Sequence, residues 1–361
     1  MTAVPASSDP TIGPGRALRR TRALLGTLAA LTTIAAACSA GADGPSGPDP
    51  LGADSAVLLE DFSGRTFLPA DNWWNLDISA APLDPQSDTL INFIRARTAA
   101  NPGADRRMHP DFGPPPYGIP YIGVSAREPL QAVTWTAYGS QSDDGAPGAP
   151  PGYPIPRAAR TVAGWIEGGI GGGGGSGDRH LILVDRDRDL LFETWATRWN
   201  GAARRWEAGS GAVFDLASNA RRPEGWTSAD AAGLAIFPGL VRFDEASRNA
   251  PITHAFRVTV RATNGHVWPA SHDAGNTAGA PPMGMRLRLK AATDIAAYPA
   301  EVRRILQAMK TYGLIVADNG SDLYVSGTMD PRWDNDVLNP AFHALNASDF
   351  EVVQRGWGAP P

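Results

Sequence analysis

The chain has 361 residues, 43% of them hydrophobic and 19% charged, a globular composition that excludes a largely disordered protein. A formal net charge of -5, with no block of lysine or arginine, argues against a nucleic-acid partner. The 40 glycines and 32 prolines favour many turns and short strands over long helices.

An arginine-rich start and a short apolar run open the chain. The apolar residues 23–37 are too few to span a membrane comfortably and are typical of the core of a signal peptide. The run ends in Ala-Ala-Ala-Cys38, which resembles the lipobox of bacterial lipoproteins, with Ala35 where that box usually has leucine. The resemblance implies cleavage before Cys38 and lipidation of its thiol. The alternative is ordinary cleavage at the alanines, which leaves a soluble secreted protein.

Cys38 is the only cysteine, so the chain can form no intramolecular disulfide and has no cysteine nucleophile or cysteine-ligated zinc site. Residues 38–57 are small, polar and rich in proline and glycine, as expected of a flexible tether. We therefore expect a signal peptide at 1–37, a tether at 38–57 and a single globular domain at 58–361. The expected location is the bacterial cell envelope, lipid-anchored or secreted, and the lipid is the only membrane contact expected.

Two segments have the apolar spacing of amphipathic helices, residues 85–97 and 298–312. Strands are expected at 121–124, 129–138, 180–184, 190–195, 206–216, 252–262, 285–290, 314–316 and 323–325. Two pairs flank turn sequences and predict hairpins, one around 185–189 and one around 318–320. The alternation in 285–290 predicts a strand with a basic, solvent-facing side. The fold class expected is mixed α+β, mainly β, with a β-sandwich or jelly-roll-like core and one or two packed helices.

Eight sequence blocks are spread along the expected domain: FLPADNWWNLDIS, HPDFG, YGIPYIGV, GDRHLILVDRD, GWTSADAAGL, HVWPASH, PPMGMRLRLK and ADNGSDLYVSG. Together they resemble a widespread, uncharacterised family of secreted bacterial proteins, over about residues 67–353. The resemblance implies an extracytoplasmic globular unit. It carries no activity, ligand or catalytic residue.

Carboxylates in apolar surroundings are the first candidates for chemistry. Glu193 lies between apolar neighbours in an expected strand, where burial would raise its pKa and suit it to general acid work. Glycoside hydrolysis needs a second carboxylate, for which Asp215 is the first candidate and Asp230, Asp244 and Asp318 are alternatives. The alternative role of Glu193 is a structural salt bridge to arginine.

A second chemistry is β-elimination from a uronate sugar. His254 or His272, or a tyrosine beside it, would remove the C5 proton, while Arg288 or Arg286 would neutralise the sugar carboxylate. The alternative for these arginines is a solvated strand exterior.

The eleven tryptophans are many for this length. Core packing explains most of them, but Trp195, Trp226 and Trp268 are candidates for stacking on sugar rings. The sequence thus predicts an extracytoplasmic lipoprotein that acts on polysaccharide as a glycoside hydrolase or polysaccharide lyase. The alternative is a non-catalytic protein that binds glycan or cell wall.

No cofactor is expected, and the chain is expected to be a monomer. The six histidines form no compact metal motif. His266, His272 and Asp273 are close enough in the chain to form a metal site, but local hydrogen bonds are the favoured role of these histidines and no metal is predicted.

Overall fold

The computed structural model describes residues 56–95, 106–172, 175 and 177–360. The leader, Cys38 and most of the expected tether lie outside the described residues, so the statements about them stay predictions. All of the described residues belong to one compact unit.

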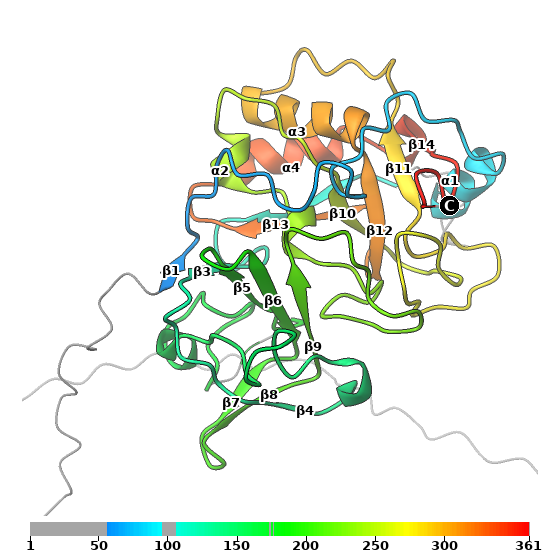
Figure 1. Cartoon of the computed structure of the whole chain (residues 1–361). Coiled ribbons are helices and arrows are strands. Elements are labelled where there is room, and N and C mark those ends of the chain that lie inside the picture. Colours follow the sequence, from blue (N-terminus) through cyan, green and yellow to red (C-terminus); the bar gives the residue numbers. More distant parts are fainter. Residues whose placement is uncertain (1–55, 96–105, 173–174, 176, 361) are drawn as a thin grey trace, which may run out of the picture. The chain divides into compact units, whose positions relative to one another are not determined.

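The first sheet has five strands in the order β1-β3-β5-β6-β9 (Figure 1). They are β1 (Ala56–Leu58), β3 (Ile122–Val124), β5 (Leu181–Asp185), β6 (Leu190–Trp195) and β9 (Ser210–Asp215). The first predicted hairpin is confirmed, because β5 and β6 pair antiparallel along their length. Leu181 and Leu183 pack into one apolar cluster, while Ile182 and Val184 pack into another. Because both faces of β5 are covered, this strand carries an unbroken apolar run.

The second sheet has six strands in the order β14-β11-β12-β10-β13-β2. They are β2 (His109–Gly113), β10 (Phe256–Val260), β11 (Arg286–Leu289), β12 (Leu314–Asn319), β13 (Tyr324–Met329) and β14 (Phe350–Val352). The second predicted hairpin is wrong, because β10 lies between β12 and β13, parallel to the first and antiparallel to the second. All five residues of β10 are buried. The backbone groups of a strand so buried need a hydrogen-bonding strand on each side. The turn sequence at 318–320 gives no sign that β10 pairs between the two strands that it connects.

A third, smaller sheet pairs strands in the order β4-β8-β7. They are β4 (Val133–Trp135), β7 (Arg198–Asn200) and β8 (Arg205–Ala208). The strand predicted at 206–216 is in fact two strands, since β8 and β9 belong to different sheets. Gly209 separates them, and a side chain there would overlap the ring of Trp195.

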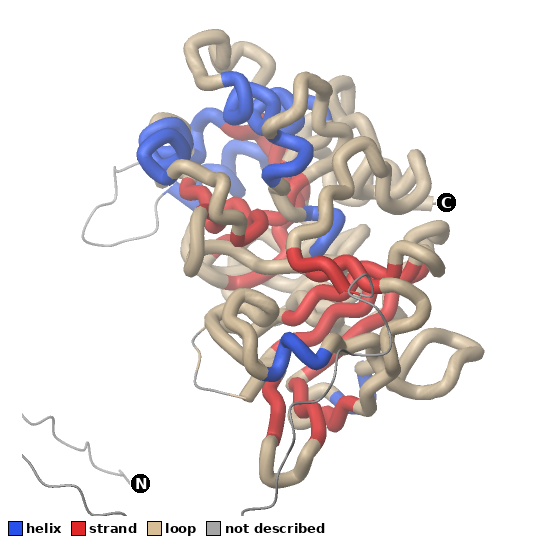
Figure 2. Tube along the Cα trace, turned by 90° about the vertical axis from the view of Figure 1, so that its left-hand side faces the viewer, coloured by secondary structure: helices blue, strands red, loops and turns tan. Residues whose placement is uncertain are grey.

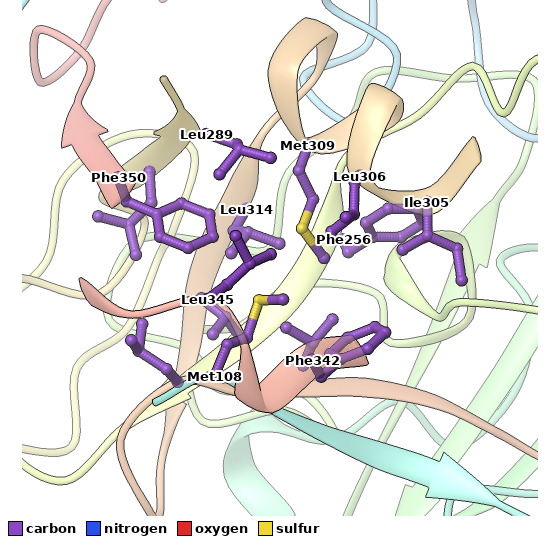
Figure 3. Packing of buried hydrophobic residues seen from close by; sticks show 14 of the residues in the cluster. Met108, Phe256, Leu289, Ile305, Leu306, Met309, Leu314, Phe342, Leu345 and Phe350 are labelled. Atoms are coloured by element: carbon purple, nitrogen blue, oxygen red, sulfur yellow. The ribbon is translucent and has the colours of Figure 1, made fainter. Parts of the chain in front are cut away.

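The helices of the described residues are α1 (Ser87–Arg95), α2 (Phe243–Ala246), α3 (Ala300–Thr311) and α4 (Asn335–His343). Both predicted helices are confirmed, as α1 and α3. The helices α1, α3 and α4 contact strands of the six-stranded sheet, and Figure 2 shows most of the helical segments in the upper part of the view. Figure 3 shows the core between them, where Ile305, Leu306 and Met309 of α3 meet Phe256 and Phe342. This apolar contact is the main force that holds the helices to the sheet.

The basic outer face predicted for 285–290 is wrong. Arg286 is buried, and its Nη2 donates to the backbone carbonyl of Trp73. Arg288 donates to Glu351 at 2.7 Å and to backbone carbonyls of residues 78–81. The reason is tertiary, because β11 lies inside its sheet and the segment 73–81 covers the face that the sequence pattern would leave to solvent.

The fold is therefore mixed α and β, mainly β, as expected, and its sheets are consistent with a sandwich-like core. Among the described residues, no helix combines the length and the apolar character that a membrane crossing requires.

Candidate functional site

A pocket of about 180 Å³ lies where the ends of β6, β9 and β12 come together with the loop 227–231. Its wall includes Trp195, Asp230, His272 and Asp318, so that two large sheets and two loops contribute to it. A larger, open groove of about 930 Å³ runs beside α3, but its one carboxylate, Asp294, is exposed. The smaller pocket holds buried ionisable groups and is the better candidate for chemistry.

The loop 227–231 is held by its own polar side chains. The Thr227 hydroxyl donates to the Asp230 carbonyl at 2.9 Å, and the Asp230 amide donates to the Ser228 hydroxyl at 2.9 Å. Gly233 ends the loop at a φ of +72°, and a Cβ there would lie 2.1 Å from the Ser271 hydroxyl. The hydroxyl groups of Thr227 and Ser228 thus close a tight turn and fix Asp230 in the pocket wall.

Two carboxylates meet at one guanidinium in this pocket. Arg257 of β10 donates through Nη2 to Asp230 Oδ1 and to Asp318 Oδ2, both at 2.8 Å. Because both oxygens lie 2.8 Å from the same nitrogen, they are within twice that distance of each other. Arg257 also donates through Nε to Asp230 and through Nη1 to Ser326 at 2.7 Å. The guanidinium is thus fixed from three sides.

The two carboxylates have different environments. Asp230 is 1% exposed, and its Oδ2 has no hydrogen-bond partner among the described residues. Burial raises the pKa of Asp230 to about 6, since desolvation and the nearby Asp318 outweigh the attraction of Arg257. The side chain of Asp318 is 24% exposed at the end of β12, and its Oδ1 accepts the Asn319 amide at 2.7 Å. One carboxyl group can therefore carry a proton near neutral pH beside a second one in contact with solvent.

The rim of the pocket is aromatic and acidic. Trp195, half-buried at the end of β6, lies 6.2 Å from the ring of Tyr138. Its indole nitrogen donates to Asp178 Oδ1 at 3.4 Å. Tyr138 and Asp178 are exposed and line the pocket as well. A flat ligand can therefore contact an aromatic surface and a carboxylate together.

His272 supplies a nitrogen base to the same wall. Its Nδ1 lies 2.8 Å from the Ala231 carbonyl. A carbonyl can only accept a hydrogen bond, so Nδ1 carries a proton, and whenever the ring is neutral Nε2 is an acceptor. No hydrogen bond to Nε2 is formed within the described part of the chain.

A buried ion pair supports the loop from behind. His180 places Nδ1 2.7 Å from Glu167 Oε2 and Nε2 3.2 Å from the carbonyl of Ala229. Burial opposes the charge of the imidazolium, but Glu167 outweighs this and raises the pKa of His180 to about 9. The charged ring donates to both groups and connects the start of β5 to the pocket loop.

Of the residues favoured from sequence, Trp195 and His272 line this pocket, and so do Asp230 and Asp318, which were named as alternatives. Glu193 is fully buried, and its carboxylate accepts the backbone amides of Ile236 and Phe237 at 2.8 to 3.0 Å. Burial raises its pKa to about 7, although those amides favour the charged form. Its observed contacts connect β6 to the segment 236–237 and do not include the pocket.

The other predicted residues are not among those that line the pocket. Asp215 is exposed and accepts the Ala217 amide, and His254 lies 2.9 Å from Glu245. Arg288 is held by Glu351, as described above. The guanidinium of Arg222 lies over the ring of Trp226, and Trp268 packs edge-on against Trp73. Cys38 lies outside the described residues.

Sequence reasoning named Asp230 and Asp318 among several alternatives but did not find Arg257, which brings them together. A signal was present, because Arg257 interrupts the apolar strand 256–260, and a cation inside a buried strand needs an anionic partner. The partners themselves lie 27 and 61 residues away along the chain.

Within the described residues, no group of three or more histidine, cysteine or acidic side chains is arranged to hold a metal ion. Comparison of the chain with protein-family models, curated proteins and solved structures found no match.

Proposed function

We propose that this pocket acts on a carbohydrate, with Asp230 and Asp318 as the carboxyl pair that hydrolyses a glycosidic bond. The observation that carries the proposal is the shared guanidinium, because it keeps a buried, protonatable carboxyl group close to an exposed carboxylate. Glycoside hydrolysis requires one group in each of these two states.

In the proposed reaction, Asp230 donates its proton to the oxygen of the leaving sugar. Asp318 attacks the anomeric carbon as that bond breaks and forms a glycosyl ester. Asp230, now ionised, then takes a proton from the water that cleaves the ester. Pairs of carboxyl groups about 5–5.5 Å apart act in this retaining way, and the separation allowed by Arg257 favours it over the wider inverting arrangement.

Elimination from a uronate is the less favoured chemistry. It needs a cation free to neutralise the sugar carboxylate. Arg257 is already paired with two carboxylates, and Arg288 is paired with Glu351 away from the pocket. The pocket therefore favours the hydrolase over the lyase.

A second candidate function is glycan binding without cleavage. The aromatic pair of Trp195 and Tyr138 at the rim favours it, because a sugar ring can stack there without any chemistry. In either case we propose that the protein works as a monomer outside the cytoplasm, lipid-anchored through Cys38 or secreted, on the grounds of the leader sequence.

The test is a screen of the purified full chain on a panel of neutral and uronic polysaccharides. New reducing ends are expected, without the absorbance near 235 nm that the unsaturated products of elimination give. Asp318→Asn should lower the cleavage rate by about 100-fold or more while leaving binding within about threefold. If the wild type binds a polysaccharide without cleaving it, the second candidate function is favoured. If it neither binds nor cleaves any polysaccharide of the panel, both candidate functions are refuted.

A further inference from the structure

We infer that the sugar bound in this pocket carries a positively charged amino group, so that the substrate class is a cationic amino sugar. The inference rests on the proposed function to the extent that the ligand is a carbohydrate. It comes from a count of the free hydrogen-bonding groups and charges in the pocket wall.

The hydrogen-bond donors of the wall are largely used within the protein. The hydroxyls of Ser210 and Ser228 donate to the carbonyls of Ser228 and Leu234, both at 2.7 Å. The Thr227 hydroxyl donates inside the same loop, and the side-chain amide of Asn319 donates to the Ala274 carbonyl at 2.9 Å. A ligand therefore finds few side-chain donors to satisfy its own acceptors.

Acceptors, in contrast, remain open. In the ionised form of Asp230, which predominates above about pH 6, Oδ2 can only accept and is buried without a partner among the described residues, which is costly unless a donor reaches it. His272 offers Nε2 as an acceptor, and Asp178 receives only one long bond at the rim, from Trp195. The pocket is thus complementary to a ligand that donates several hydrogen bonds, as an ammonium group does with three.

The charge balance favours the same ligand. Asp178, Asp230 and Asp318 line the pocket, and the nearby cation Arg257 is shared between two of them. No lysine or arginine belongs to the described wall. A uronate would meet uncompensated negative charge, whereas an ammonium group would find carboxylates and the faces of Trp195 and Tyr138, which also attract cations.

The experiment measures binding and cleavage of two matched probes by the full chain, a β-1,4-linked glucosamine tetramer and its fully N-acetylated form. At about pH 6.5 Asp230, whose pKa is about 6, is mostly ionised and much of the free amine is still charged, and acetylation removes only that charge and its donors. We expect the glucosamine tetramer to bind at least about tenfold more tightly. Salt at about 1 M should reduce this preference, because it screens charges at the rim.

Asp178→Asn should reduce the preference for the charged tetramer several-fold. The matched control is Asp88→Asn, which removes an exposed carboxylate in the first turn of α1 and should leave the preference unchanged. Equal or tighter binding of the acetylated tetramer by the wild type overturns the inference, as does an unchanged preference in Asp178→Asn.

The outcomes separate the inference from the proposed function. If the glucosamine tetramer is preferred but not cleaved, the inference stands and hydrolysis fails. If the acetylated tetramer is preferred and cleaved, hydrolysis stands and the inference fails. If neither tetramer binds or is cleaved, the inference fails, and the wider polysaccharide panel decides on the proposed function.

Discussion

The ion pair of His180 with Glu167 gives the sharpest prediction about stability. The pKa of His180 is about 9 in the folded protein, against about 6.5 for an ordinary histidine. Because the folded state binds the proton more tightly, the pair adds stability that is complete below about pH 6.5 and is lost as the pH rises through 9. The difference corresponds to about 3 kcal/mol, of which about 2 kcal/mol should disappear between about pH 7 and pH 9.

The assay is urea unfolding of the wild type and of His180→Gln across this pH range. The free energy of unfolding of the wild type should fall with rising pH, and that of the variant should be lower at pH 7 and change less. Two other buried groups, Asp230 and Glu193, also lower stability as they ionise, but they do so at or below about pH 7. Arg286, whose pKa burial lowers to about 9, and His266, whose pKa is raised, also titrate near this window, but they do so in both proteins. The difference between the wild type and His180→Gln therefore isolates His180.

The control variant is His266→Gln. His266 also contacts two carboxylates, Glu224 and Asp273, but at the surface, where such pairs contribute at most about 1 kcal/mol. Identical pH slopes for the wild type and His180→Gln, or a titration of the His180 ring near 6.5 by NMR, would refute the reasoning.

Three further predictions concern the pocket and the leader. Because Asp230 must donate a proton, kcat/KM for a cleaved glycan should fall as the pH rises through about 6, and a flat profile would exclude it as the acid. Trp195→Ala should weaken glycan binding about three- to tenfold, as measured by calorimetry. Trp226 lies outside the pocket, so Trp226→Ala should leave binding unchanged, and equal effects of the two variants would show that Trp195 does not stack on the sugar. Cys38→Ser should move the protein from the detergent phase to the aqueous phase after extraction, and unchanged partitioning would exclude lipidation.

Part of the site could be read from local sequence. Trp195 and His272 stood out by residue type, and both line the pocket. The apolar neighbours of Glu193 predict a buried carboxyl group with a raised pKa, and burial does raise its pKa. Its partners are the backbone amides of residues 236 and 237, and a pattern of side chains cannot predict a bond to a backbone group. Asp230 and Asp318 could be named only as alternatives, because their proximity depends on Arg257 in a third segment.

Local patterns along the chain are enough to predict the mainly β class, the β5–β6 hairpin, and the helices α1 and α3, because these depend on contacts between residues close together in the chain. The position of β10 between β12 and β13 and the burial of Arg286 follow instead from packing between distant segments. The same is true of the meeting of Asp230 and Asp318 in the pocket. Pairing between distant strands and the covering of a strand face by a remote loop are long-range events, and residue spacing along the chain does not encode them.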